Sequence, residues 1–90
     1  MPSFLVETYL TRRRAEDRDA CDGRARAAAE ELTRESMRVR FDRSIHVPED
    51  EICFFVFDAP SGPVAALAAR RAGLDPIRVV EAVSSGQEEK

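Results

Sequence analysis

Residues 44–60, SIHVPEDEICFFVFDAP, decide how this chain is expected to fold. Two stretches rich in β-branched and aromatic residues flank Pro48–Glu51, an acidic segment with the composition of a tight turn. A four-residue hairpin loop at this point would place His46 opposite Cys53 on the neighbouring strand. The sequence therefore predicts that the only imidazole of the chain lies beside a thiol on one side of a sheet.

The rest of the chain supplies the other elements of a sheet covered by helices. Further strands are indicated by apolar residues that alternate with polar ones, and helices by apolar residues at spacings of three and four. In chain order we expect a strand at 4–10, a helix at 15–35, strands at 37–47 and 52–57, a helix capped by Ser61 and ended by Gly73, and a strand at 77–83. This βαββαβ order predicts an α+β protein with a ferredoxin-like fold, in which a four-stranded antiparallel sheet carries two helices on one face.

Size and composition limit the class of protein. Ninety residues form one domain, which we expect at 1–83, followed by a flexible tail at 84–90. A chain this short buries little surface by itself, so we expect a homodimer. No apolar run approaches the roughly 20 residues needed to cross a bilayer, and the N-terminus lacks the pattern of a secretion signal. We therefore expect a cytoplasmic protein that does not bind membranes. The formal net charge of −3 gives no general attraction to nucleic acid, so we expect none as a partner.

The alternation along each strand predicts which side chains face the helices. If the apolar residues of the first two strands form the core, the hairpin adds Ile52, Phe54 and Val56 to that core. The opposite face would then mix apolar and ionisable side chains, namely Leu5, Glu7, Tyr9, Arg40, Asp42, Ser44, His46, Cys53, Phe55 and Phe57. A second subunit laid across this face, with Glu81 of the last strand pointing the same way, would enclose a pocket lined by Glu7, His46, Cys53 and Glu81.

Short motifs along nearly the whole chain are similar to those of one known family. They are Phe4-Leu5-Val6-Glu7, Arg43-Ser44, Pro48-Glu49-Asp50-Glu51 followed by Cys53, Ala59-Pro60-Ser61, Ala72-Gly73-Leu74 and Val80-Glu81-Ala82-Val83. In these motifs the chain resembles a group of small bacterial proteins, known as a domain of unknown function, whose characterised member is a dimeric nickel-binding protein with a ferredoxin-like fold. The resemblance implies this fold, a dimer and a nickel site that uses Cys53 and Glu81, with Glu7 as a further ligand. Metal-binding members often carry histidines near the end of the first strand, where this chain has Glu7-Thr8-Tyr9.

Several functions fit these residue types. Ni(II) and Zn(II) accept imidazole, thiolate and carboxylate ligands, which makes a candidate metal site of His46, Cys53, Glu7 and Glu81. Cys53 activated by His46 would instead be a nucleophile, although no catalytic motif surrounds it. A small-molecule pocket, as in the dimeric α+β barrel monooxygenases and cyclases that share this topology, is the alternative. The simplest interpretation makes Cys53 a core residue and pairs the two glutamates with arginines.

We therefore expect a homodimer that binds a divalent transition metal, nickel in particular, without catalysis of its own. Replacement of Cys53 by alanine is then expected to lower nickel affinity sharply without unfolding the dimer. This expectation depends on strand parity, because His46 and Cys53 must both project away from the helices.

Overall fold

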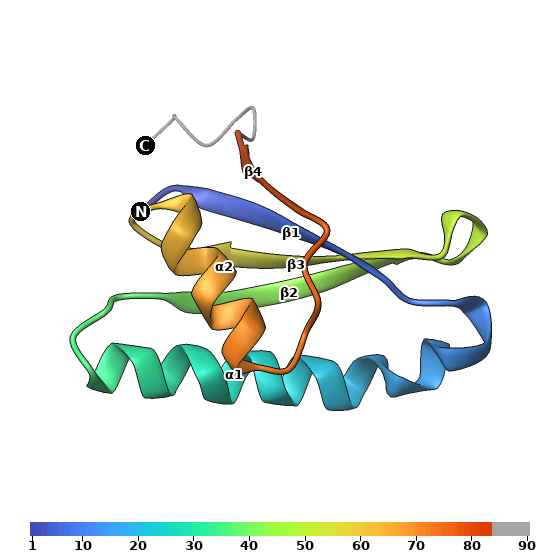
Figure 1. The fold of residues 1–90 in the computed structure, drawn as a ribbon, viewed down its shortest axis with the longest axis horizontal. Coiled ribbons are helices and arrows are strands. Elements are labelled where there is room, and N and C mark those ends of the chain that lie inside the picture. Colours follow the sequence, from blue (N-terminus) through green and yellow to red (C-terminus); the bar gives the residue numbers. More distant parts are fainter. Residues whose placement is uncertain (84–90) are drawn as a thin grey trace.

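The computed structural model describes residues 1–83 as four antiparallel strands and two α-helices (Figure 1). The elements are β1 (Ser3–Tyr9), a 3₁₀ helix η1 (Arg12–Asp17), α1 (Arg18–Arg34), β2 (Arg40–Val47), a 3₁₀ helix η2 (Pro48–Asp50), β3 (Ile52–Asp58), α2 (Gly62–Arg71) and β4 (Arg78–Ala82). The strands lie in the order β2-β3-β1-β4. The predicted ferredoxin-like βαββαβ fold is confirmed, and the predicted tail at 84–90 lies outside the described residues.

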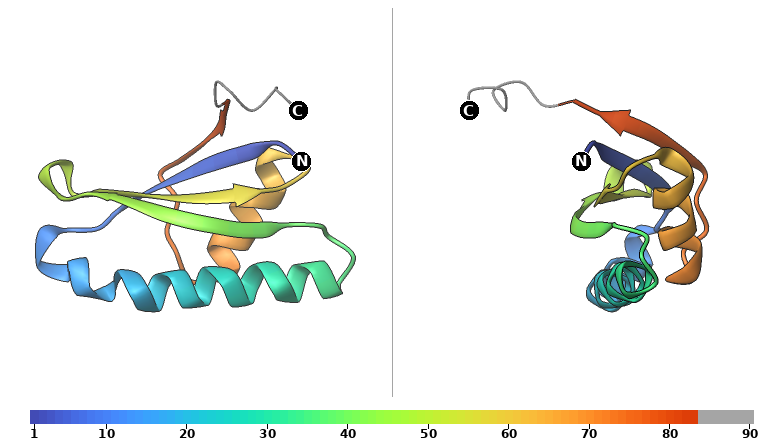
Figure 2. Two further views of the ribbon diagram at one scale, coloured as in Figure 1. Left: turned by 180° about the vertical axis from the view of Figure 1, so that it is seen from behind. Right: turned by 90° about the vertical axis from the view of Figure 1, so that its left-hand side faces the viewer.

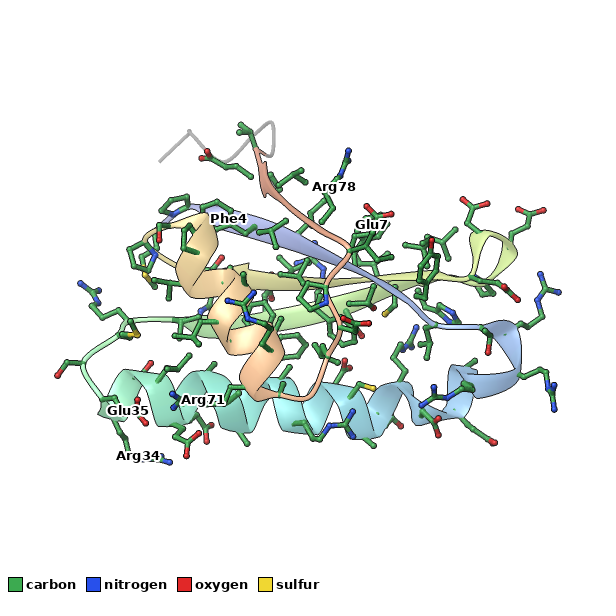
Figure 3. All side chains as sticks on the ribbon, in the orientation of Figure 1. Phe4, Glu7, Arg34, Glu35, Arg71 and Arg78 are labelled. Atoms are coloured by element: carbon green, nitrogen blue, oxygen red, sulfur yellow. The ribbon has the colours of Figure 1, made fainter. Side chains whose placement is uncertain are left out.

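Both helices cover the same face of the sheet. In the view from behind, the strands pass in front of α2, so the other face has no helix over it (Figure 2). Helix α1 packs against β2, and α2 packs against β1 and β4. The two helices also contact each other, where the Arg71 guanidinium lies 2.7 Å from the Glu35 carboxylate (Figure 3).

The ends of α2 follow the capping chemistry that the sequence indicates. The Ser61 hydroxyl accepts a hydrogen bond from the backbone N–H of Val64 at 3.4 Å. At the other end Gly73 adopts a positive φ of 83°, which lets the N–H of Leu74 donate to the carbonyl of Ala69 at 3.0 Å. This is the pattern of a Schellman motif, which satisfies carbonyl groups at the end of a helix.

Two element boundaries differ from the prediction by three residues, and the other strand bounds differ by at most one. The helix predicted at 15–35 begins at Arg18, because residues 12–17 form the 3₁₀ helix η1. The strand predicted from residue 37 begins at Arg40, because Met37, beyond the end of α1, donates its N–H to the helix carbonyl of Leu32 at 2.9 Å. The chain between α1 and β2 is therefore used to close the helix.

The faces of β3 are the reverse of the predicted ones. Cys53, Phe55 and Phe57 are at most 1% exposed and belong to the core between sheet and helices. The prediction that these three side chains lie on the opposite face is wrong, as is the prediction that the intervening apolar residues of β3 form the core. Those residues, Ile52, Phe54 and Val56, alternate with the core residues and therefore point to the uncovered face.

A β-bulge in β2 explains the reversal. Phe41 and Arg43 pair with consecutive residues of β3, so that Asp42 is an extra residue without a partner. An extra residue exchanges the two faces of a strand beyond the bulge. Phe41 faces the helices as predicted, whereas Ile45 and Val47 point to the uncovered face and Ser44 and His46 point to the helices.

Candidate functional site

The helix-covered side of the sheet is apolar at one end and polar at the other. At the apolar end Phe41, Phe57 and Phe4 form one row across three strands, and the ring centroids of Phe41 and Phe57 are 5.4 Å apart. The corresponding row at the other end consists of His46, Cys53 and Thr8. Polar side chains inside the molecule therefore gather at a single end of the sheet, below the start of α1.

His46 pairs with Cys53, as the hairpin predicts. Its Nε2 lies 3.0 Å from the carbonyl oxygen of Leu10, and since a carbonyl only accepts, Nε2 carries the proton and donates. The hydroxyl of Thr8 donates to the carbonyl of Cys53 at 3.1 Å. These bonds hold the end of β1 against the β2–β3 hairpin, which is a structural role for both polar side chains.

The thiol of Cys53 is poorly suited to nucleophilic attack. Burial, reinforced by the negative charge of Asp22, raises the pKa of Cys53 to about 11 from its ordinary value of 9.0, although Arg18 and a hydrogen bond with Ser44 act in the opposite direction. The side chain is 0% exposed. Because the thiolate is the reactive and metal-binding form of cysteine, this neutral and enclosed thiol lacks two requirements of a catalytic residue.

The four predicted metal ligands lie in different places. His46 and Cys53 lie together under the helices, whereas Glu7 points to the uncovered face, where its carboxylate is 3.6 Å from Nε of Arg78 (Figure 3). Glu81 is exposed on the edge strand β4, at the register position opposite Phe4. The prediction that one open face carries all four residues is wrong, because the bulge in β2 turns His46 and Cys53 toward the helices.

No metal site is assembled within the described part of the chain. Among residues 1–83, no three side chains of the types His, Cys, Asp and Glu are grouped closely enough to hold a metal ion. The sheet itself separates Cys53 from any second subunit placed on the uncovered face. Nickel binding stays a prediction from the sequence resemblance, and the interpretation of Glu7 as the partner of an arginine is confirmed by Arg78.

A cavity of about 270 Å³ lies beside the row formed by His46, Cys53 and Thr8. It lies where β1, the start of α1 and the loop after α2 come together, and Phe55 of β3 also lines it. Polar groups around it come from Thr8, Tyr9, Arg14, Cys21, Arg24 and Asp75, and Arg14 is paired with Asp17. These residues are far apart in the sequence, so the cavity exists only in the folded chain.

Arg24 is held at this cavity by two hydrogen bonds. Its Nε donates to the carbonyl oxygen of Ala72 at 2.9 Å, and its Nη2 donates to Sγ of Cys21 at 3.3 Å. A guanidinium has five N–H donors, so three remain for other partners. None of the salt bridges found within residues 1–83 involves Arg24. The sequence did not single out Arg24, because it is one of many arginines and its partners are set by tertiary contacts.

The uncovered face of the sheet is largely apolar. Tyr9 is 73% exposed and Ile45 is 41% exposed, and the strand register places them on the same face as Leu5, Val47, Ile52, Phe54, Val56, Val80 and Ala82. Its charged groups are the ion pair of Glu7 with Arg78 and, at the end of the sheet near Ser3, Arg43 and the ion pair of Arg40 with Asp58. The sequence predicted a face of mixed apolar and ionisable side chains here, and most of the residues that it assigned to this face from β2 and β3 lie on the other side.

Comparisons with known proteins identify the fold alone. No family model matches the chain, and no curated protein shows significant sequence similarity to it. The crystal structure of SCO4226 from Streptomyces coelicolor A3(2) is similar in fold, with a TM-score of 0.76, 14% sequence identity, and coverage of 92% of this chain and 98% of that one. Within residues 1–83, neither helix has the length and apolar character to cross a membrane.

Proposed function

We propose that this protein is a homodimer that binds a small organic monoanion in the cavity beside Arg24. The observation that carries the proposal is the Arg24 guanidinium, which two hydrogen bonds hold at the edge of this cavity and which has unused N–H donors. A guanidinium in a fixed orientation is suited to a carboxylate, which it binds through two parallel hydrogen bonds.

The lining of the cavity restricts the ligand. A volume of about 270 Å³ equals that of roughly nine water molecules at about 30 Å³ each, which limits the ligand to a small molecule. Phe55 offers an apolar surface, and Thr8 offers a hydroxyl group. Asp75 lies at the same cavity and would repel a ligand with two negative charges. These features favour a small aromatic or aliphatic monocarboxylate over a phosphate ester.

The uncovered face of the sheet supports the dimer. A contiguous apolar surface of this kind on a chain of 90 residues is typical of an interface. A second copy related by a two-fold axis would place the same apolar residues against one another. The charge of Glu7 is compensated by Arg78 within the same chain, so the interface would not bury an isolated carboxylate.

A set of small acids tests the ligand. Benzoate, phenylacetate, methyl phosphate and the neutral analogue benzamide are titrated into the protein, and the melting temperature and heat of binding are recorded. We expect a monocarboxylate to stabilise the protein and the substitution Arg24→Gln to abolish this effect. Arg13→Gln removes the same charge from an exposed position that lines none of the cavities described here, and should bind as the native chain does. Equal binding of benzoate and benzamide, or equal losses in both variants, would contradict the proposal.

A separate experiment tests the dimer. Phe54 lies at the centre of the uncovered face, between Ile45 and Glu7 in the strand register. We expect Phe54→Asp to convert a dimer into a folded monomer in sedimentation equilibrium, with the circular dichroism spectrum retained. Ala27→Asp introduces the same charge on the exposed side of α1 and should leave the dimer intact. A native chain that sediments as a monomer at high concentration would refute the interface without affecting the ligand site.

A further inference from the structure

A second and larger hollow lies toward the C-terminal end of α1, apart from the cavity beside Arg24. Its volume is about 480 Å³, and it is formed by the C-terminal half of α1 together with the start of the edge strand β2. The floor consists of Ala29, Val39 and Phe41, each at most 6% exposed. This volume lies within the range of roughly 300–1,000 Å³ that is typical of sites for small organic ligands.

Arginine side chains surround the apolar floor. Arg26, Arg38 and Arg40 all line the hollow, together with the single acidic residue Glu30. Arg40 forms an ion pair with Asp58 of the neighbouring strand. For Arg26 and Arg38 no salt bridge is found in the part of the chain that the structure describes. The hollow therefore combines an apolar floor with two cationic groups that form no salt bridge within the described residues.

Arg26 also extends the apolar surface. Its guanidinium carbon lies 5.2 Å from the centroid of the Phe41 ring, in a cation–π contact. A guanidinium in this position can still donate hydrogen bonds in its plane while its face covers the ring. This arrangement is suited to a flat ligand that packs on the floor and directs an acidic group toward Arg26 and Arg38.

We infer that this hollow is a binding site for an aromatic organic anion, distinct from the site beside Arg24. The aromatic body would lie on Val39 and on the outer face of the Arg26 guanidinium that covers the Phe41 ring. The acidic group would meet Arg38 and the in-plane N–H groups of Arg26. The inference does not depend on the proposed function, because the two cavities share no lining residue. The ligand inferred for this hollow has a larger apolar body than the cavity beside Arg24 can hold.

Two related fluorescent probes test this site. The first, 8-anilinonaphthalene-1-sulfonate, is an aromatic anion, and the second, N-phenyl-1-naphthylamine, has the same aromatic body without the charge. We expect Arg38→Gln to weaken binding of the anionic probe about tenfold, through the loss of one charge-assisted hydrogen bond, and to leave binding of the uncharged probe unchanged. Arg26→Gln should weaken both probes, since it also removes part of the apolar surface.

Arg34→Gln is the matched control. Arg34 is an exposed arginine of the same helix that does not line this hollow. We expect the Arg34→Gln variant to bind both probes as the native chain does. When the anionic probe is added to the native chain, we expect the amide chemical shifts to change mainly within residues 26–41. Equal weakening by Arg34→Gln and Arg38→Gln, unchanged affinity in Arg38→Gln, or shift changes centred on Arg24 would each overturn the inference. The Arg38 side chain is exposed, so its substitution does not put folding at risk.

Discussion

The substitution Cys53→Ala tests the placement of the only cysteine that the sequence assigned to a site. In the structure its side chain is fully buried among the core residues. Within residues 1–83 it belongs to no group of three or more side chains that could hold a metal ion. Removal of one buried heavy atom leaves a small cavity and usually costs about 1–1.5 kcal/mol. At pH 7 we therefore expect Cys53→Ala to lower the free energy of unfolding by about this amount.

The dependence on pH gives this prediction a second, independent part. Burial raises the pKa of Cys53 to about 11 from 9.0, so the thiol contributes its full stabilisation below pH 9 and loses it as the pH rises toward 11. The loss is about 2 kcal/mol by pH 11, at about 1.4 kcal/mol for each pH unit. The alanine variant has no such group. We expect its stability curve to cross that of the native chain near about pH 10, above which the variant is the more stable protein.

Urea unfolding between pH 7 and 11, in the presence of a phosphine reductant, measures both parts. Nickel titration of the same two proteins, prepared without a histidine tag, is expected to give identical isotherms. Stability curves that run parallel from pH 8 to 11 would show that the thiol is accessible to water. A sharp loss of nickel affinity in a variant of unchanged stability would show that Cys53 is a metal ligand, and would refute the burial on which the reasoning rests.

Four further substitutions test the backbone and one carboxylate. Gly73→Ala should destabilise the protein by about 1 kcal/mol, because Gly73 has a φ of 83°. Gly23→Ala within α1 should stabilise it by about as much, because an added Cβ there meets nothing within 4 Å. Urea unfolding that gives both changes the same sign would contradict this. Ser36 has a φ of 75°, so Ser36→Gly should raise the melting temperature by a few degrees, and a lower value would refute the strain. For Asp58, burial raises the pKa, but hydrogen bonds from Ser3 and Arg40 outweigh it and hold the pKa below its ordinary value of 3.8. Its stabilisation is therefore present above that value and is lost in more acidic solution. In acid titrations followed by circular dichroism, Asp58→Asn should be less stable at pH 7 and lose less stability below about pH 4.

Much of the fold follows from patterns that are local in the sequence. Alternation of apolar residues indicated the strands, and the acidic turn fixed the hairpin register that pairs His46 with Cys53. Ser61 and Gly73 marked the two ends of α2, because a hydroxyl caps a helix start and glycine accepts a positive φ at its end. Such signals are readable because each one depends on residues that are neighbours in the chain.

The face of the sheet to which each side chain points was decided by the register of the strand pairing, not by local patterns in the sequence. One extra residue, Asp42, exchanges the two faces of β2 beyond it. Because β3 is paired residue by residue with β1 and β2, Cys53 faces the helices together with Thr8 and His46. The alternation in the sequence is interrupted at Arg43, which marks the irregularity but does not tell which half of the strand faces the core.

The candidate binding sites depend still more on tertiary structure. Arg24 is fixed by the carbonyl of Ala72, a residue 48 positions away, and the larger hollow joins Arg26 of α1 to Phe41 of β2. Composition and spacing determined the elements, their order and the presence of an apolar sheet face. The cavities and their arginines were decided by the packing of helices on the sheet, because a guanidinium acquires a specific environment only when distant segments meet around it.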